Sequence, residues 1–572
     1  MKKILILVLT ILAMTAIFCV TAFAAESGPV MKVQYGSETK EFNVFDDGWN
    51  FAMETAGSGK EVTVTLLKDW SATDGQFTDD FSNGAGFDYD AIYFAVDVKM
   101  IFDLNGHTID RGLVAPEMNG EVMFINDDAT VTIKNGTIKG GYSNNGAGGI
   151  HIENANVTLI DLVFTGNRVR DDDGAAIQHT DGGKLHMKNC SFVSNEGSKS
   201  GIASYGTVFL ADVDSVLIED CRFKNNVRLS YGAGIYATSV RDLQIKNTTF
   251  EGHRATQRGG AIWVGGESSA LYLYNCLFKD NSSDVGQQSS NIFGHYGGAI
   301  YADQATLYVY DCTFSGNYAR WDGGAVYFNN VNNAIFERCT FDDNTGGWDG
   351  GAFFVNSNSS VSVYGCTFTN NKATETGGAI YLDFSSYVFL YSDDENQKPT
   401  IIKNNKAGEI GGGIYQVKDR AILALEGEIY VKENVSALGQ DDIYVEAFNN
   451  VYVGKISSPE ASIGIRCTEE ASGSVVKPDS AENSSSVAAF FSNVEGLEIR
   501  FAESQSFSKL QMYMHMTDFG ENTPDKIGSI FGDGSLTTIV AFAALIASIA
   551  SIGVQIASNK KKNAPATTDN EE

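Results

Sequence analysis

The sequence predicts an all-β solenoid, a parallel β-helix, and three observations support this fold class. First, a phrase of Gly-Gly-Ala-Ile or Gly-Gly-Ala-Val followed by an aromatic residue recurs between residues 146 and 415. Second, a Phe-x-x-Asn phrase recurs with its phenylalanines 27 to 36 residues apart, and in one copy His253 replaces the asparagine. Third, apolar and polar residues alternate ahead of each phenylalanine, as in half-buried strands. A fixed period of this size is typical of stacked repeats, so each repeat is predicted to form one coil.

Stacking the coils in register places equivalent residues in columns along the solenoid. Neighbouring strands lie ~4.8 Å apart, so like side chains come into contact from coil to coil. The phenylalanine is expected inside, and the asparagine at a turn where its amide passes hydrogen bonds between coils. Three residues before the phenylalanine, an Asn or Asp is expected to form a bend with positive φ. The glycine pair is expected to make a corner that a Cβ would obstruct.

The pairing of these two phrases resembles the repeat of the polymorphic outer-membrane protein family, and the resemblance covers roughly residues 100–415. It implies a right-handed, surface-exposed β-helix within the larger pectate-lyase-like superfamily. Members of that family end in an outer-membrane β-barrel that exports them. We expect no such autotransporter barrel in this chain, so export by self-transport is not implied.

The first residues have the pattern of a secretory signal peptide. Lys2 and Lys3 precede the apolar run Ile4–Val20, and Ala22-Phe23-Ala24 provides a small-residue cleavage signal. The following segment is expected to cap the open end of the solenoid, because uncovered strand edges favour aggregation. Within it, a short amphipathic helix with an Asp N-cap is predicted over Asp46–Met53.

The far end of the chain predicts a membrane anchor. Thr537–Ala557 is an uncharged run long enough to cross a bilayer as a helix, and Lys560, Lys561 and Lys562 follow at once. The positive-inside rule then places the tail in the cytoplasm and the solenoid outside the cell. The predicted division is 1–24 signal peptide, 25–60 N-terminal cap, 61–415 parallel β-helix, 416–515 irregular terminal coils, 516–536 stalk, 537–557 transmembrane helix and 558–572 cytoplasmic tail.

The composition fits a soluble surface protein built of strands and tight turns. The chain has 60 Gly, only 7 Pro and a formal net charge of −30. The excess of acidic over basic residues argues against nucleic acid and anionic membrane surfaces as partners.

Six of the eight cysteines fall in one column, two residues before the phenylalanine. A secreted chain invites a disulfide interpretation, and the coil spacing lies within the Cα range of a bridge. Stacked side chains point in parallel, however, which does not suit the disulfide dihedral, so we favour buried free thiols. A linear stack cannot supply tetrahedral ligands, and no metal or cofactor is expected. The column comprises Cys190, Cys221, Cys276, Cys312, Cys339 and Cys366.

An aromatic residue ends each glycine phrase, between two residues that face inward, so it is predicted to face outward. These residues would form an exposed ladder ~29 Å long at the strand spacing. Such a stripe favours a binding surface for a glycan or protein ligand, although stacked aromatics also stabilise a sheet without any ligand. The ladder comprises Tyr236, Trp263, Tyr301, Tyr327, Phe354, Tyr381 and Tyr415, and Trp321 and Trp348 are expected at the corner beside it.

The resemblance also implies an alternative function, catalysis, because the superfamily includes polysaccharide lyases and glycoside hydrolases that act on the outer face of the β-helix. Candidate residues are Asp171–Asp173, Asp342 with Asp343, and Arg254 with Arg258. The acidic pairs lie in turn positions, and hydrolysis needs carboxylates that converge across a groove, so no catalytic residue is assigned. The expected function is a membrane-anchored, adhesin-like surface protein that binds an extracellular glycan or protein. The alternative is a surface-tethered polysaccharide lyase or glycoside hydrolase.

Overall fold

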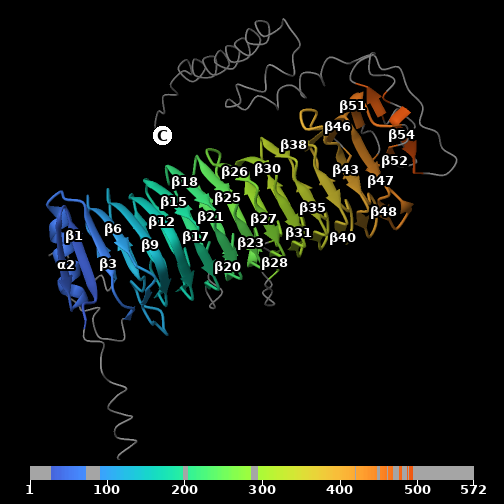
Figure 1. Ribbon diagram of the computed structural model, residues 1–572. Helices are drawn as coiled ribbons and strands as arrows, with labels where there is room; N and C mark the ends of the chain where they lie inside the picture. Colours follow the sequence, from blue (N-terminus) through green and yellow to red (C-terminus); the bar gives the residue numbers. More distant parts are fainter. Residues whose placement is uncertain are drawn as a thin grey trace, which may run out of the picture. The chain divides into compact units, whose positions relative to one another are not determined.

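The structure, a computed structural model, describes residues 28–71, 91–197, 204–284, 294–418, 420–446, 451–459, 462–467, 476–478, 486 and 488–493. These residues form a right-handed parallel β-helix, which confirms the predicted fold class. Each coil in the middle of the β-helix contributes one strand to each of three faces, and these strands pair in parallel with their equivalents in the next coil (Figure 1), whereas β1 pairs antiparallel with β3 at the N-terminal end. The faces are called here the first, second and third face.

The first face consists of the strands that follow the glycine phrase. Ile300 of one coil pairs with Ile262 and Val326 of its neighbours, so the repeats stack in the predicted register. The strands are β5 (Ile92–Phe94), β8 (Met123–Ile125), β11 (Ile150–Glu153), β14 (Ile177–Thr180), β17 (Val208–Ala211), β21 (Ile235–Thr238), β25 (Ile262–Gly265), β29 (Ile300–Asp303), β33 (Val326–Asn329), β37 (Phe353–Val355), β41 (Ile380–Leu382), β45 (Ile414–Gln416), β50 (Ile443–Val445), β52 (Ile463–Cys467) and β54 (Phe490–Ser492).

The second face holds the alternating strands that precede the bend. In β26 and β30 every second residue is buried, as the sequence predicts. The strands are β1 (Met31–Tyr35), β3 (Val62–Leu66), β6 (Lys99–Asp103), the first parts of β9 (Thr130–Lys139) and β12 (Asn156–Thr165), β15 (Lys184–Lys188), β18 (Ser215–Glu219), β22 (Leu243–Lys246), β26 (Ala270–Tyr274), β30 (Thr306–Tyr310), β34 (Ala334–Glu337), β38 (Ser360–Tyr364), β42 (Tyr387–Tyr391), β46 (Ile422–Gly427), β51 (Val451–Ile456) and β53 (Val476–Pro478).

The third face holds the phenylalanine of each repeat. Its strands are β4 (Trp70–Ser71), β7 (Thr108–Asp110), the second parts of β9 and β12, β16 (Ser191–Val193), β19 (Arg222–Lys224), β23 (Thr249–Glu251), β27 (Leu277–Lys279), β31 (Thr313–Ser315), β35 (Thr340–Asp342), β39 (Thr367–Thr369), β43 (Thr400–Lys403) and β47 (Ile429–Lys432). The bends that separate the second face from the third have positive φ at the predicted Asn and Asp positions, for example Asn275 and Asp311.

Short strands beyond the asparagine turn form a further sheet that leads back to the first face. They are β20 (Val227–Tyr231), β24 (Arg254–Arg258), β28 (Ser282–Ser283), β32 (Tyr318–Ala319), β36 (Thr345–Gly346), β40 (Lys372–Ala373), β44 (Lys406–Ala407), β48 (Val435–Ser436) and β49 (Gly439–Gln440), with β10 (Tyr142–Ser143) and β13 (Arg168–Val169) as a separate pair. These strands place the residues just before the glycine phrase at the corner of the first face.

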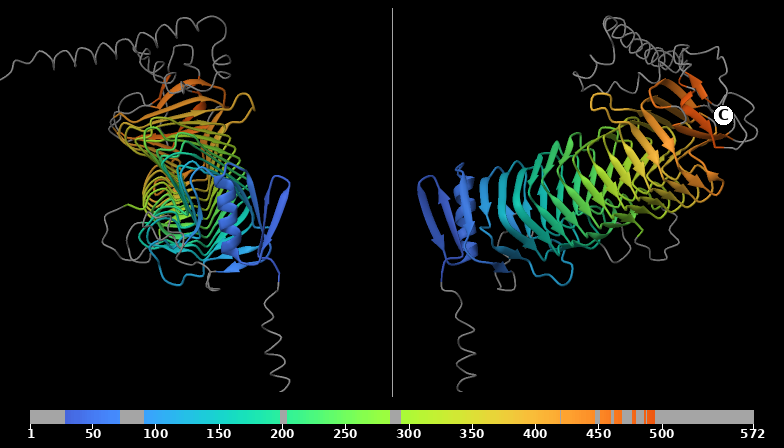
Figure 2. Two further views of the ribbon diagram at one scale, coloured as in Figure 1. Left: turned by 90° about the vertical axis from the view of Figure 1, so that its left-hand side faces the viewer. Right: turned by 45° about the vertical axis from the view of Figure 1, so that its right-hand side comes forward.

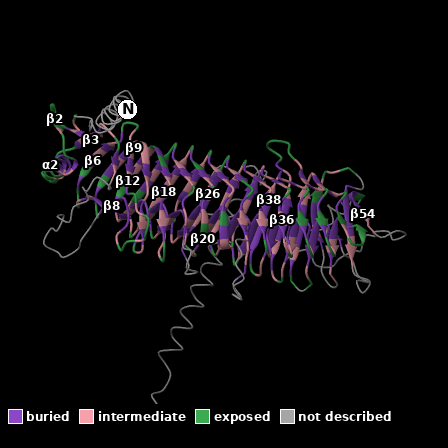
Figure 3. Ribbon diagram, turned by 90° about the horizontal axis from the view of Figure 1, so that it is seen from below, coloured by how far each residue is buried: buried purple, intermediate pink, exposed green. Residues whose placement is uncertain are grey.

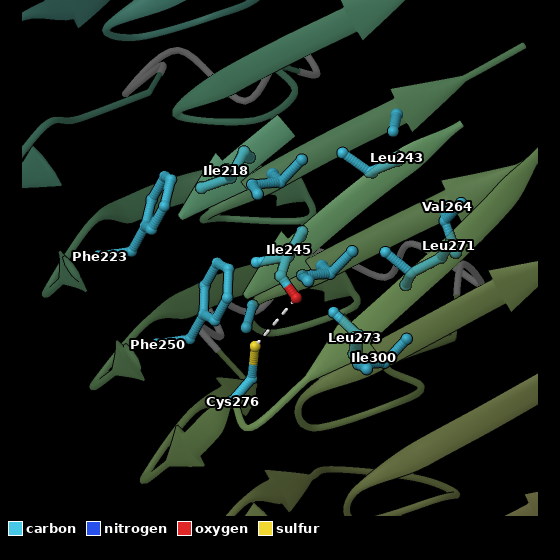
Figure 4. Close-up of a cluster of buried hydrophobic side chains, with 14 of the residues drawn as sticks. Ile218, Phe223, Leu243, Ile245, Phe250, Val264, Leu271, Leu273, Cys276 and Ile300 are labelled. Atoms are coloured by element: carbon cyan, nitrogen blue, oxygen red, sulfur yellow. Dashed lines mark hydrogen bonds between the residues drawn. The ribbon is translucent and has the colours of Figure 1, made fainter. Parts of the chain in front are cut away.

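The core is a set of apolar columns inside the coils. The eight phenylalanines of the repeat, from Phe164 to Phe368, are fully buried, and neighbouring rings stack with centroids 4.6 to 4.9 Å apart. Phe223 and Phe250 lie one above the other in Figure 4, opposite Ile218 and Ile245 of the second face. Figure 3 shows buried positions along every row of strands and exposed positions at the turns. The predicted interior columns are therefore confirmed.

The six cysteines form a column of buried thiols within this core. All six cysteines of the predicted column are buried and free, and no disulfide joins the cysteines that the structure describes. The Cys276 thiol lies 3.5 Å from the Ile245 carbonyl oxygen (Figure 4). The Cys276 N–H donates to Cys312 Sγ over 3.3 Å. Thr248 and Thr400 occupy the same column, and their hydroxyl oxygens accept the backbone N–H of Cys221 and Cys366 in the preceding coils. The thiols therefore act as weak hydrogen-bonding groups in a stacked column.

The asparagine column forms a ladder of hydrogen bonds on both sides of His253. Asn317 is fully buried, and its Oδ1 accepts the backbone N–H and the side-chain amide of Asn281 over 3.1 and 3.0 Å. Its own amide donates to the Phe278 carbonyl over 3.0 Å and to Asn344 Oδ1 over 2.9 Å. Towards the C-terminal end Asp442 takes the place of the asparagine: its carboxylate accepts from Asn434 and from the Asn493 amide, and its N–H donates to Asn493 Oδ1. The predicted hydrogen bonding between coils is confirmed.

His253 interrupts this ladder. Its Nδ1 accepts the Asn226 N–H over 3.3 Å, so the imidazole must be neutral there, and its Nε2 has no hydrogen-bond partner. Burial lowers the pKa of His253 to about 4. A proton on Nδ1 would face another donor, which adds to the cost of charging the ring.

Replacing His253 with Asn is expected to raise stability and to reduce its dependence on pH. An unfolded histidine titrates near 6.5, so the unfolded chain binds more protons than the folded one between about pH 6.5 and 4. Stability therefore falls as the pH falls through this window, by about 3 kcal/mol for this group. Denaturant unfolding at pH 7 and pH 4.5 measures the difference. An equal loss in wild type and H253N would show that other groups cause the acid sensitivity.

An α-helix and a hairpin cover the N-terminal end of the β-helix (Figure 2). Helix α2 (Phe45–Gly57) begins at Phe45 without a side-chain cap, so the predicted Asp N-cap is wrong, and Asp46 lies in the first turn. Its buried face includes Trp49, whose indole N–H donates to the Tyr93 carbonyl over 3.0 Å. Strand β2 (Glu38–Phe42), which the sequence did not predict, pairs with β1 antiparallel and carries charged residues along its free edge.

The predicted membrane span and the predicted signal peptide lie outside the described residues. Within the part of the chain that the structure describes, no helix is long and apolar enough to cross a membrane.

Candidate functional site

The predicted aromatic ladder lies on the outer side of the first face. In β29, Ile300 and Ala302 are buried in the main core, and Tyr301 between them points away from it. Tyr301 pairs with Trp263 of the preceding coil and with Tyr327 of the next. The other ladder residues occupy equivalent positions, and the ladder packs as a cluster separate from the main core.

The rings of the ladder stack face to face along the sheet. The centroids of Tyr301 and Tyr327 are 5.1 Å apart with planes 7° from parallel, and those of Tyr327 and Phe354 are 5.0 Å apart at 2°. Phe354 and Tyr381 follow at 4.6 Å and 8°. Tyr327, Phe354 and Tyr381 thus each have a neighbouring ring on both faces, whereas no ring contact joins Trp263 to Tyr301 among the described residues. A sugar ring therefore cannot stack on the faces of Tyr327, Phe354 or Tyr381.

The prediction that the ladder is exposed is wrong for four of its seven residues. Tyr301, Tyr327, Phe354 and Tyr415 are only 2, 6, 8 and 6% exposed. The remaining three, Tyr236, Trp263 and Tyr381, are half-buried. The physical reason is a second row of side chains that packs over the ladder from the corner.

We call this second row the corner row. It consists of the residues that directly precede the first glycine of the phrase, Tyr205, Tyr231, Arg258, Tyr296, Asp322 and Asp349. The Tyr296 ring centroid is 4.5 Å from that of Tyr327, and Tyr205 stacks on Tyr236 at 4.9 Å. Sequence reasoning missed the corner row, because the residue type before the glycine changes from coil to coil.

The predicted tryptophan pair extends the corner row outward. Trp321 and Trp348 stack with centroids 4.7 Å apart and planes 5° from parallel. Tyr296 contacts Trp321 edge-on at 5.5 Å, which joins the pair to the corner row. Trp348 is 45% exposed, and the equivalent position in the next coil is Glu375, whose N–H donates to the Trp348 carbonyl. The outer face of Trp348 therefore has no stacked ring on it among the described residues.

Arg258 places one positive charge within the corner row. Its guanidinium carbon lies 5.1 Å from the ring centroid of Tyr301, 5.7 Å from that of Tyr231 and 5.8 Å from that of Tyr296. These distances are typical of cation–π contacts. Arg254, its partner in the sequence analysis, lies at the other end of β24 and is exposed.

Two carboxylates follow in the next coils of the corner row. Burial and the neighbouring Asp349 raise the pKa of Asp322 to about 7, and burial also raises the pKa of Asp349. Asp322 Oδ1 accepts the Asp349 N–H over 3.2 Å, and Asp349 Oδ1 accepts the Thr376 N–H over 2.9 Å. Each carboxylate thus links one coil to the next by a hydrogen bond. The pKa of Asp322, near neutrality, is also a property of general acids in enzymes.

The acidic residues proposed from sequence as catalytic candidates do not converge on one groove. Asp172 accepts the Gly146 N–H over 2.7 Å and Asp173 accepts the Tyr205 N–H over 2.8 Å, as turn residues do. Burial raises the pKa of Asp173 to about 7. Asp343 pairs with Lys372 over 2.6 Å at the surface of the third face. Among the described residues, no group of three His, Cys, Asp or Glu side chains could hold a metal ion.

Comparison with known proteins supports the fold and adds no activity. Residues 206–435 match the family model described as a right-handed β-helix region. This stretch contains all seven residues of the predicted aromatic ladder and both Trp321 and Trp348. No curated protein and no solved structure matches the chain.

The ladder is longer than the sequence analysis proposed. Phe209 stacks on Tyr236 with centroids 5.2 Å apart, and Tyr444 stacks on Tyr415 at 5.8 Å. Both residues occupy the ladder position of coils in which the glycine phrase is incomplete or absent: only Gly206 remains before Phe209, and no glycine directly precedes Ile443. The alternation of buried and outward residues around them was the remaining signal.

Proposed function

We propose that the protein is a membrane-anchored, extracellular β-helix that binds a glycan at the corner of its first face. The observation that carries this proposal is the aromatic surface formed by Tyr296, Trp321 and Trp348 outside the core, with Trp348 45% exposed. Exposed aromatic surfaces of this kind favour a binding role. The signal-peptide pattern, the apolar run near the C-terminus and the surplus of acid in the sequence fit a surface location.

The mode of binding follows from which ring faces are free. Tyr327, Phe354 and Tyr381 of the ladder offer only their edges, so this part of the ladder serves as the support for the corner row. Trp348 offers one face for a sugar ring, because its other face rests on Trp321. Glu375 follows Trp348 in the next coil and can accept hydrogen bonds from sugar hydroxyls. An aromatic face beside a carboxylate combines an apolar platform with polar groups that fix orientation.

Cleavage of a bound polysaccharide is the second candidate function. It is favoured by Asp322, a buried carboxyl group with a pKa of about 7, which lies next to Trp321 in sequence. Such a group can hold a proton at neutral pH and donate it to a leaving group. A reducing-sugar release assay separates this candidate from binding alone, and release abolished in D322N would establish it.

Replacing Trp348 with Ala is expected to weaken glycan binding roughly tenfold or more, because exposed tryptophans at binding sites are frequent energetic hot spots. A glycan array identifies binding glycans, and calorimetry with the strongest of them measures the affinity. Phe384→Ala is the matched control, since Phe384 is also 45% exposed but follows the first face, away from the corner row. Equal affinity of the two variants would contradict the proposed site.

A further inference from the structure

Arg258 is a cation for which the described residues provide no anion. Some other arginines of the chain have carboxylate partners: Arg222 pairs with Glu251 over 3.0 Å, and Arg338 pairs with Asp311 over 2.8 Å. No carboxylate of the described residues lies within ion-pair distance of Arg258, and its buried Nε has no hydrogen-bond partner. The site is otherwise built, because three tyrosine rings surround the guanidinium at 5.1 to 5.8 Å.

Aromatic partners leave the hydrogen-bonding capacity of this guanidinium unused. A guanidinium carries five N–H donors in its plane, and ring faces interact with it by cation–π attraction without satisfying this set of donors. Its planar fork matches the two oxygens of a carboxylate, and also fits the oxygens of a sulfate or phosphate group. An unpaired guanidinium held in place by rings is therefore preorganised for an acidic group.

We propose that Arg258 binds an acidic group, a carboxylate or a sulfate, of a glycan that lies along the corner row. This inference rests on the proposed function and names its ligand class. Arg258 and Trp348 belong to the same corner, with Tyr296 and Trp321 between them. The glycan would place its acidic group at Arg258 and a neutral sugar on Trp348.

The surrounding charges restrict the ligand further. The chain carries a formal net charge of −30, and Asp322, Asp349 and Glu375 lie on the Trp348 side of the corner. A polymer with a charge on every sugar would be repelled by these carboxylates. The ligand class is therefore a largely neutral glycan with an isolated acidic group.

The test uses an array on which each glycan core is present in neutral, carboxylated and sulfated form, with the full-length protein. Wild type is expected to bind an acidic form about tenfold to a hundredfold more tightly than the neutral form of the same core, the range of a charged hydrogen bond. Arg258→Gln is expected to abolish this preference and to leave binding of the neutral form unchanged. Arg254→Gln, four residues earlier on the same strand, is the control and should keep the preference. The carboxylated and sulfated arms identify which acidic group is bound.

Several outcomes would overturn the inference. Equal affinity of wild type for neutral and acidic forms, or an equal loss of both in R258Q, would reduce Arg258 to a packing role. Thermal unfolding of R258Q, compared with wild type, shows whether packing is affected. Binding that depends on Trp348 but shows no preference for the acidic forms in wild type would contradict this inference and retain the proposed function. If the protein bound no glycan on the array, both this inference and the proposed function would be contradicted.

Discussion

Gly324→Ala is expected to lower the free energy of unfolding by about 3 kcal/mol or more, at or above the upper end of overpacking effects. Gly324 is the second glycine of a repeat phrase, and an ideal Cβ there would lie 2.1 Å from the Gly351 carbonyl oxygen and 2.5 Å from the Thr345 carbonyl carbon. All of these are backbone atoms of the next coil. No side-chain rotation can relieve the clash, so the coils must separate locally.

Gly57→Ala is the control for this experiment. Gly57 ends helix α2, and an ideal Cβ there would meet no atom within 4 Å. Alanine favours a helix over glycine, so this variant should be neutral or slightly stabilised. Denaturant unfolding monitored by circular dichroism compares the two. A Gly324→Ala variant as stable as Gly57→Ala would mean that the coils can move apart at no cost, against the close packing of the repeat.

The interior of the β-helix could be predicted from the sequence because each column repeats one residue type. Phe314 and Asn317 recur at the same spacing in most coils, and burial of a strongly apolar ring leaves few alternatives for its direction. The glycine pair was predictable for the same reason, since a corner with a close backbone neighbour excludes every Cβ. Because the repeats lie within one chain, equivalent positions could be compared with one another, and their shared residue type predicted which side chains are buried.

The exposure of the aromatic ladder could not be predicted in the same way. Alternation shows that Tyr327 points away from the core, and the structure agrees. Whether an outward residue contacts water depends on what its neighbours cover, and Tyr296 reaches Tyr327 from the adjacent corner. The position before the glycine varies among Tyr, Arg, Asp and Thr, so no column signalled a covering layer there. The unpaired state of Arg258 likewise depends on distances that the sequence does not contain.

Asn317→Ala is expected to cost about 3–6 kcal/mol of unfolding free energy, because several buried groups lose their partners at about 1–3 kcal/mol each. The Asn281 N–H and the Asn281 amide lose their shared acceptor, and the Phe278 carbonyl loses a donor. Asn317 is fully buried, so water cannot replace these bonds without opening the turn. Denaturant unfolding of the variant against wild type measures the loss. Ser315→Ala is the matched control, since Ser315 lies in the same coil, is half-buried and faces outward.

Asn317→His separates the loss of hydrogen bonds from the loss of volume. The chain itself uses histidine at position 253 of the same column, where Nδ1 accepts the preceding backbone N–H. N317H should therefore restore an acceptor for the Asn281 N–H but not for the second donor, and its stability should fall between those of wild type and N317A at pH 7. Below about pH 6 it should lose stability further, as a buried neutral histidine does. If N317H and N317A were equally unstable at pH 7, the ladder would depend on the shape of asparagine rather than on its hydrogen bonds.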